Sequence, residues 1–269
     1  MTGNERQQHE LMATLGLGDF ETWEQCAERQ AKMARRFRNA DRQRPVNWIW
    51  ERCEPDACAC TLCKDGCWFA SRHHRYQMIT EAHRLFNTQT DDLHFVSVAH
   101  PKWELAVGNL ARANITAARQ WLYRRFKRLD TTVVAVGGFE ASMNVDLGGT
   151  STWAGHVHLV VAGSDKPSLK KALQIEKHYR SRPYSRPVDV RDVDNLGRRL
   201  GYSLKRIARR RVAYIDGQGR QNRNQANLAA SEQREFDNWL LGLSVGDRTI
   251  LIGCRSHGGQ LRLVNGHAG

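Results

Sequence analysis

The sequence lacks the apolar segments that place a chain in a membrane or mark it for secretion. No apolar run approaches the roughly 20 residues that a helix needs to span a bilayer. Residues 1–10 are polar and lack the apolar stretch of a secretory signal. Internal repeats and low-complexity segments are also missing. We therefore expect a globular protein of the cytoplasm, with no membrane partner.

Acidic residues are too few to balance the basic ones. The chain has 41 Lys and Arg against 28 Asp and Glu, which gives a net charge of +13 and a pI near 9.8. Such an excess indicates a polyanionic partner, either nucleic acid or an anionic membrane surface. No amphipathic helix with a bulky apolar face and basic flanks is evident. The charge therefore favours nucleic acid, with a merely soluble basic protein as the alternative.

Five of the seven cysteines lie between Cys53 and Cys67. In a reducing compartment such clustering indicates metal binding rather than disulfides, and Cys60 and Cys63 have the spacing of a metal knuckle. We predict a structural or DNA-docking zinc site with four thiolate ligands, namely Cys58, Cys60, Cys63 and Cys67. One cysteine is spare, either Cys53 or Cys60. The alternatives are a ligand from His73 or His74, a compact iron–sulfur site, and unligated cysteines.

From residue 92 the hydrophobic pattern alternates between the periods of strands and helices. It predicts strands at 93–99, 132–140, 153–162 and 187–193. It predicts helices at 109–129, 167–179 and 195–210. The order β-α-β-β-α-β, followed by a helix, is typical of an α+β, ferredoxin-like fold, in which an antiparallel sheet carries its helices on one face.

Three regions are expected along the chain. Residues 1–90 form a helical and Cys-rich N-terminal region, residues 91–211 the central domain, and residues 212–269 a C-terminal extension. Within the outer regions the pattern predicts helices at 18–40, 72–86 and 232–241 and short strands at 212–215 and 249–253.

Two histidines stand two residues apart in the strand expected at 153–162. Because successive side chains of a strand alternate between its faces, His156 and His158 project together, while Val157 enters the opposite, core-facing layer. Two imidazoles on one rigid strand can chelate a divalent ion. An isolated pair of this kind is more often a polar patch on a solvated strand, so the neighbouring residues must decide.

A third ligand is expected from the preceding strand. If the hairpin turn is centred on Gly149, Glu140 pairs opposite His158 on the same face. A shift of one residue would turn Glu140 to the other face, where it would be an ordinary edge carboxylate. Asn144 and Asp146 are the alternative ligands. Two histidines and one carboxylate suit zinc, manganese or non-haem iron on coordination grounds alone.

The helix expected at 195–210 carries a tyrosine away from its apolar face. Its buried stripe is formed by Leu196, Leu200, Leu204 and Ile207. Tyr202 lies on another side, together with Arg198, Lys205 and Arg209. A tyrosine among cations is well placed to meet a phosphate, and packing at the edge of the core is an equal alternative. A free phenol has a pKa near ~10, so it needs positive charge nearby to act as a nucleophile.

These residues resemble the motifs of the HUH endonucleases. The triplet His156-Val157-His158 resembles the HUH motif, which has an apolar residue between two histidines. The segment Tyr202-Ser203-Leu204-Lys205 resembles the Tyr-x-x-Lys motif of members with a single catalytic tyrosine. The strand Phe95-Val96-Ser97-Val98 resembles the first, structural strand motif of the family. The resemblance covers residues 92–211, and the order of the motifs and the β-α-β-β-α-β frame also fit.

The resemblance implies a replication initiator of a plasmid, phage or other mobile element. Tyr202 would be the nucleophile that cuts single-stranded or hairpin DNA, forms a 5′-phosphotyrosine and leaves a free 3′-hydroxyl, with assistance from Lys205. Mg²⁺ or Mn²⁺ would be held by Glu140, His156 and His158. The sequence has no Gly-x-x-x-x-Gly-Lys-Ser/Thr phosphate loop. A host helicase and the host replication machinery would therefore unwind and copy the element by a rolling-circle route.

Two basic runs lie on either side of the expected site in the sequence. We expect phosphate contacts from Arg124, Arg125, Arg128, Arg198, Arg206, Arg209 and Arg210. A solvated helix face is the usual explanation of such runs. A transposase or a relaxase would use the same chemistry as an initiator. A non-catalytic zinc-dependent DNA-binding protein would need neither the paired histidines nor Tyr202, and a small-molecule metalloenzyme would leave the charge of +13 unexplained.

Overall fold

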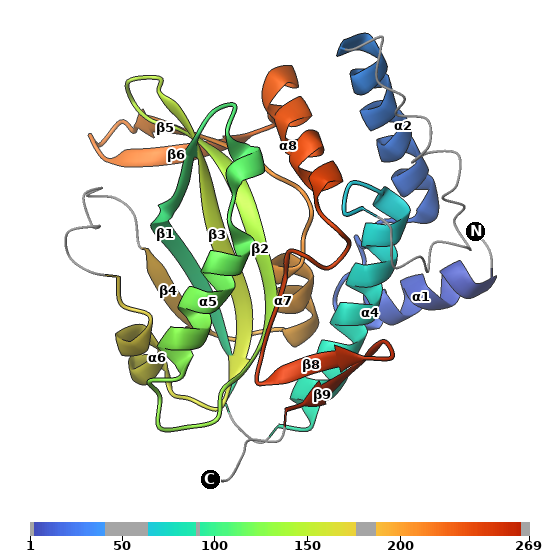
Figure 1. The fold of residues 1–269 in the computed structure, drawn as a ribbon, viewed down its shortest axis with the longest axis vertical. Helices are drawn as coiled ribbons and strands as arrows, with labels where there is room; N and C mark the ends of the chain where they lie inside the picture. Colours follow the sequence, from blue (N-terminus) through green and yellow to red (C-terminus); the bar gives the residue numbers. More distant parts are fainter. Residues whose placement is uncertain (1–2, 41–63, 90–91, 176–186, 265–269) are drawn as a thin grey trace.

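The structure is a computed structural model that describes residues 3–40, 64–89, 92–175 and 187–264. At its centre lies a sheet with the strand order β4-β1-β3-β2-β5-β6, and β7 also pairs with β2 (Figure 1). The strands are β1 (His94–Ala106), β2 (Val134–Val145), β3 (Ser151–Ala162), β4 (Val188–Asp192), β5 (Arg210–Ile215), β6 (Gln221–Ala226) and β7 (Thr249–Ile252). The pair β2–β5 is parallel, and the other pairs of this sheet are antiparallel.

Helices connect and cover these strands. They are α1 (Gly3–Thr14), α2 (Trp23–Ala40), α4 (Trp68–Asn87), α5 (Ile115–Phe126), α6 (Lys166–Ala172), α7 (Leu196–Ser203) and α8 (Ala230–Gly242). A short 3-10 helix, η1 (Leu110–Arg112), precedes α5, and a separate hairpin is made by β8 (Cys254–His257) and β9 (Gln260–Leu263). The fold is thus α+β with a mostly antiparallel sheet, and its inner order β4-β1-β3-β2 is compatible with the predicted ferredoxin-like arrangement. Among the described helices, none is long and apolar enough to cross a membrane.

The two helices of the predicted β-α-β-β-α-β frame, α5 and α6, lie on one face of the sheet as expected, and α1, α4 and α7 cover the other face. On β3, Val157, Leu159 and Val161 belong to a core with α5, α6 and α8. Val160 and Ala162 point the other way and belong to a second core with α1, α4 and α7. Because both faces of the strand are apolar at this end, both must be covered. The predicted placement of Val157 in a core opposite the histidines is confirmed.

Helix α7 is shorter than its apolar periodicity suggests. It ends at Ser203 instead of residue 210, because Arg210 begins β5, which pairs with Met143 of β2. Ile207, which the helical stripe placed in the core, is 38% exposed. The N-cap of α7 is Asn195, whose side chain accepts a hydrogen bond of 2.8 Å from the backbone N–H of Arg198.

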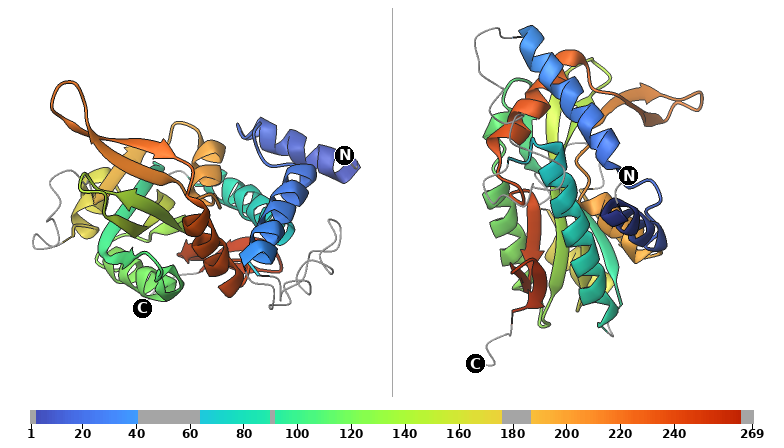
Figure 2. Two further views of the ribbon diagram at one scale, coloured as in Figure 1. Left: turned by 90° about the horizontal axis from the view of Figure 1, so that it is seen from above. Right: turned by 90° about the vertical axis from the view of Figure 1, so that its right-hand side faces the viewer.

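The strands β5 and β6 form a ribbon that projects beyond the main sheet (Figure 2). Strand β6 lies between the strand expected at 212–215 and the helix expected at 232–241, where the sequence pattern predicts no strand. Its side chains are almost all exposed, so no hydrophobic alternation marks it in the sequence. The parallel pairing of β5 with β2 fixes the base of the ribbon and sets Arg211 beside Asn144.

Candidate metal and phosphate site

The hairpin β2–β3 brings the three predicted metal ligands onto one face. Glu140 pairs with His156, whereas His158 pairs with Gly138. The prediction that Glu140 stands opposite His158 is therefore wrong by two residues, because the turn is centred one residue earlier than Gly149. A strand repeats its face every two residues, so this error leaves Glu140 on the predicted face.

The three side chains form a compact buried group. His156 Nε2 lies 3.2 Å from Glu140 Oε1, and His158 Nε2 lies 3.7 Å from Glu140 Oε2. Each residue is 5–6% exposed. Their ligand atoms all lie within 4.8 Å of one another, which is close enough to hold a metal ion. Within the described part of the chain, no other group of three or more His, Cys, Asp or Glu residues meets this condition.

Hydrogen bonds orient both imidazoles towards the carboxylate. The Nδ1–H of His156 donates to the carbonyl oxygen of Ala154 at 3.1 Å. His158 Nδ1 lies 2.8 Å from Ser97 Oγ. When the proton of His158 is on Nδ1, this N–H donates to Ser97 Oγ and Nε2 keeps its lone pair. Both Nε2 atoms are buried and face the Glu140 carboxylate, whose Oε2 also lies 3.0 Å from Lys205 Nζ. A histidine that donates its other N–H is the usual metal ligand, so the group fits a divalent ion.

The protonation states also suit a cation. Burial, reinforced by the neighbouring His156, lowers the pKa of His158 well below its usual value, so this imidazole is neutral at neutral pH. Burial by itself would raise the pKa of Glu140, but His156, Lys205 and His158 outweigh it and lower that pKa to about 2. The group therefore offers an ionised carboxylate and a neutral imidazole, the forms that bind metals.

Tyr202 and Lys205 lie at the edge of this group. The ring of Tyr202 meets the ring of His158 edge-on, with centroids 4.9 Å apart, and Tyr202 is 40% exposed. Lys205 Nζ lies 3.6 Å from the centroid of the Tyr202 ring and 3.0 Å from Glu140 Oε2. The ring of Tyr202, the ammonium group of Lys205 and the carboxylate of Glu140 thus lie together.

Gly138 lets α7 come close enough to the sheet to make this contact. A Cβ atom at position 138 would lie 2.8 Å from the carbonyl oxygen of Ser203, which is closer than side chains tolerate. Gly138 pairs with His158 in the ladder, and Ser203 directly follows Tyr202. The missing side chain therefore sets the distance between the tyrosine and the histidine.

A buried ion pair contacts the backbone next to Glu140 and at Lys205. Arg248 Nε lies 2.5 Å from Asp65 Oδ2, and the guanidinium also reaches the carbonyl oxygens of Phe139 and Lys205 at 3.4 and 3.3 Å. Arg206 is 2% exposed, donates to the carbonyl oxygen of Gly66 at 2.6 Å, and therefore lies inside the protein. The prediction that Arg206 contacts a phosphate is therefore wrong.

The other predicted arginines are divided between two places. Arg124, Arg125 and Arg128 lie at the end of α5, which packs on the face of the sheet opposite the histidines (Figure 1). They therefore do not flank the site, contrary to expectation. Arg198 is exposed on α7, whereas Arg209 is exposed just before β5, where its carbonyl oxygen accepts from the backbone N–H of Met143 and its guanidinium bonds Asn227. Arg210 is half-buried and lies 3.7 Å from Glu232.

The predicted zinc site falls mainly outside the described residues, which exclude Cys53, Cys58, Cys60 and Cys63. Cys67 is described and is buried at the N-cap of α4, in one cluster with Cys26, which the prediction did not include. Burial raises the pKa of Cys26 to about 12, so it stays a thiol. The alternative ligand His74 has its Nε2 2.8 Å from Thr249 Oγ1.

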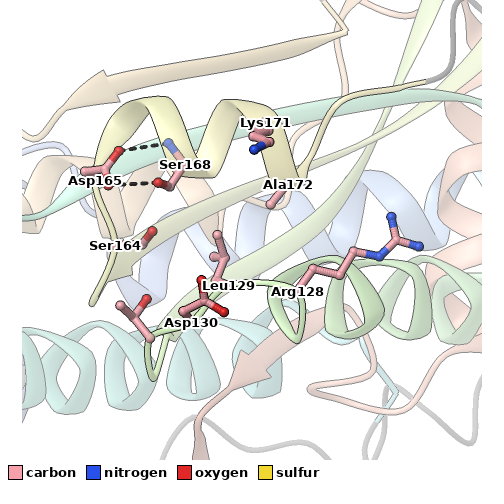
Figure 3. A pocket seen from close by; sticks show the side chains of 9 residues that line it. Arg128, Leu129, Asp130, Ser164, Asp165, Ser168, Lys171 and Ala172 are labelled. Carbon is pink, nitrogen blue, oxygen red and sulfur yellow. Dashed lines mark hydrogen bonds between the residues drawn. The ribbon is translucent and has the colours of Figure 1, made fainter.

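A separate hollow of about 520 Å³ lies between the turn after α5 and the start of α6 (Figure 3). Arg128 and Lys171 line it together with Asp130 and Asp165, so its charges are mixed. Asp165 is already used as a helix cap, since it accepts hydrogen bonds of 2.8 Å from the backbone N–H and the hydroxyl of Ser168. The hollow contains none of the predicted catalytic or metal-binding residues.

Sequence reasoning missed two supports of the site. Ser97 stands out as a hydroxyl in an apolar strand, and this signal could have identified it. The pair Asp65 and Arg248 joins residues 183 positions apart, and nothing local marks it. Strand alternation placed Glu140, His156 and His158 on one face, and these candidate ligands do lie together. No family model, curated protein or solved structure matches this chain, so the assignment rests on its own residues.

Proposed function

We propose that this protein cuts single-stranded DNA by transferring a 5′ phosphate to Tyr202, as the replication initiators of the HUH class do. Glu140, His156 and His158 would hold Mg²⁺ or Mn²⁺ at the scissile phosphate. One observation carries the proposal: the phenol of Tyr202, the ammonium of Lys205 and the three ligands meet on one face of the sheet. The activity would start rolling-circle replication of a mobile element.

The reaction is a transesterification. Tyr202 Oη forms a bond to phosphorus, and the bond from phosphorus to the 3′ oxygen of the neighbouring nucleotide breaks. The phenol loses a proton and the released 3′ oxygen gains one, so the numbers of protons and phosphodiester bonds are unchanged. The energy of the broken bond is kept in the phosphotyrosine, and a 3′-hydroxyl can later attack it and rejoin the strand.

Each side chain has a distinct task in this step. The cation would neutralise the charge of the scissile phosphate. Lys205 places positive charge over the ring of Tyr202, which favours negative charge developing on the phenol oxygen. Ser97 and the carbonyl oxygen of Ala154 hold His158 and His156 in the orientation that leaves Nε2 for the cation.

The charge of the chain supports a nucleic-acid substrate. A net charge of +13 gives affinity for the phosphate backbone without reading sequence. Arg198 is exposed on α7, the helix that carries Tyr202, and Arg209 is exposed just before β5, so both can contact phosphates of a bound strand. Because the sequence contains no helicase phosphate loop, we propose that a host helicase and host polymerase act after the nick.

Tyr202→Phe tests the proposal directly. The wild-type protein is incubated with Mn²⁺ and labelled single-stranded DNA that covers its own gene and flanks, and covalent adducts are separated on a denaturing gel. We expect an adduct with the wild type and none with the variant, which lacks the nucleophilic oxygen. Binding of the same DNA should change less than about twofold, because the ring and its contacts remain.

Tyr123→Phe is the matched control, because Tyr123 is exposed on α5, on the opposite face of the sheet. This variant should form the adduct as the wild type does. An adduct that persists in Tyr202→Phe would assign the nucleophile to another tyrosine, with Tyr214 of β5 examined first and Tyr179 and Tyr184 next. DNA binding without any adduct in the wild type would identify a non-catalytic DNA-binding protein.

A further inference from the structure

A second polar site lies directly beside the metal ligands. A cavity of about 390 Å³ opens next to His156 and His158, between the middle of the sheet and the base of the β5–β6 ribbon. Ser142 and Asn144 line it from β2, and Arg211 lines it from β5. Its volume lies within the range of about 300–1,000 Å³ that small-molecule ligands occupy.

Polar atoms that line this cavity are buried without a partner among the described residues. The hydroxyl of Ser142, a residue only 1% exposed, makes no hydrogen bond. The same holds for Asn144 Oδ1 and Arg211 Nε. Such groups cost free energy unless a ligand or water satisfies them. Together they offer a hydroxyl, an amide and a guanidinium, which match the polar edge of a base and a phosphate.

The order of residues along β2 places the metal ligands between the cavity and the tyrosine. Asn144, Ser142, Glu140 and Gly138 follow one another on the same face, because they are two residues apart in a continuous ladder. The cavity lies at the Asn144 end. Helix α7, which carries Tyr202, lies over the Gly138 end.

This order matters for a phosphate held at the metal ligands. In phosphoryl transfer the attacking and leaving oxygens lie roughly in line on opposite sides of phosphorus. If Tyr202 attacks from the Gly138 end, the leaving 3′ oxygen points towards Ser142 and Asn144. The nucleotide that carries this oxygen must then lie in or next to the cavity.

We propose that the cavity beside His156 binds one deoxynucleotide, the one immediately 5′ of the cut, which keeps the 3′-hydroxyl. Ser142 and Asn144 contact its base, and Arg211 contacts its 5′ phosphate. The identification of this nucleotide rests on the proposed function, whereas the binding of a nucleotide rests on the cavity alone. The site therefore gives the enzyme a preference for the last base before the nick.

Binding of the four deoxynucleoside 5′-monophosphates, measured by calorimetry in EDTA, tests the cavity without catalysis. Each has the phosphate and the free 3′-hydroxyl of the proposed occupant. We expect at least one to bind the wild type. Arg211→Gln should weaken binding about tenfold by removing a charge-assisted contact, and Ser142→Ala or Asn144→Ala should change the ranking of the four bases. Lys171→Gln, in the separate hollow beside α6, is the control and should change nothing.

A second experiment tests whether the cavity binds the nucleotide immediately 5′ of the cut. A pool of randomised single-stranded DNA is cleaved with Mn²⁺, and the new 3′ ends are sequenced. The wild type should prefer one base at the 3′ end, and Asn144→Ala should flatten this preference without changing the preference at the 5′ end. Circular dichroism verifies that each variant folds, and Arg211→Lys replaces Arg211→Gln if the latter does not.

The outcomes separate the two proposals. Monophosphate binding that depends on Arg211, in a protein that never cuts DNA, supports the cavity and rejects the proposed function. Cleavage with an unchanged 3′ preference in Asn144→Ala rejects the cavity as the nucleotide site and leaves the nuclease intact. Equal binding by wild type and Arg211→Gln, or no binding of any monophosphate by the wild type, also rejects the cavity.

Discussion

Ser97 illustrates how one hydroxyl can determine what a histidine does. Its oxygen lies 2.8 Å from His158 Nδ1, and the partner of this atom decides which nitrogen keeps a lone pair. Without Ser97 the buried ring could carry its proton on Nε2, the atom that faces Glu140 3.7 Å away. The serine is thus a positioning residue for a metal ligand.

Ser97→Ala should weaken Mn²⁺ binding by about tenfold, the lower end of the range for lost partners of ligating histidines. The measurement is a titration of the metal-free protein with Mn²⁺, followed by calorimetry or by the signal of free Mn²⁺ in electron paramagnetic resonance. Ser151→Ala, on the same strand as the histidines, is the control and should bind as the wild type does. Equal affinities in both variants would show that Ser97 does not orient His158.

The position of α7 depends on one close approach to the sheet. Gly138 leaves room for the carbonyl oxygen of Ser203. A Cβ atom at position 138 would lie only 2.8 Å from this oxygen. Backbone atoms cannot rotate away as a flexible side chain can, so the end of the helix must move. Tyr202 and Lys205 would move with it, while the three ligands on β2 and β3 would stay.

Gly138→Ala should therefore separate catalysis from metal binding. We expect adduct formation with single-stranded DNA to fall more than about tenfold, and the free energy of unfolding to fall by about 1–3 kcal/mol, as in other overpacked sites. The affinity for Mn²⁺ should stay close to that of the wild type. Gly148→Ala, in the turn of the same hairpin, meets its nearest atom at 3.5 Å and should have little effect on either measurement. A variant with full activity would show that α7 need not lie this close.

The elements of the inner sheet could be predicted because each satisfies a local rule. Alternating residues identified β2 and β3, and the same alternation placed Glu140 on the face of the histidines despite an error of two residues in register. Tertiary pairing decided the rest. The helical pattern runs on to Ile207, but the pairing of Arg210 with Met143 ends the helix early. Strand β6 is exposed and polar, and no period in its sequence reveals it.

The basic residues of the molecule are spread over both faces of the sheet. Arg124 lies on α5 and Arg128 in the turn that follows it, on the side of the core that contains Val157. Arg198 lies on α7, the helix that carries Tyr202, and Arg209 lies just before β5. If DNA is cut at Tyr202, only the second pair should contribute to the binding of the cleaved strand.

The salt dependence of DNA binding tests this division. Replacing Arg198 and Arg209 by Gln should lower the slope of log K against log salt by about 1.4, because each phosphate contact on single-stranded DNA contributes about 0.7. Replacing Arg124 and Arg128 by Gln removes the same charge and should leave the slope unchanged. A larger loss in the α5 variant would place the DNA on the opposite face and would contradict the proposed site.

The ion pair between Asp65 and Arg248 also has a consequence for how the protein is made. Arg248, whose guanidinium bonds the carbonyl oxygens of Phe139 and Lys205, follows Lys205 by 43 residues in the chain and is therefore synthesised later. A nascent chain on the ribosome therefore holds Glu140, Tyr202 and Lys205 before it has the arginine that bonds the backbone beside them. Products of premature termination before Arg248 would lack an ordered catalytic corner.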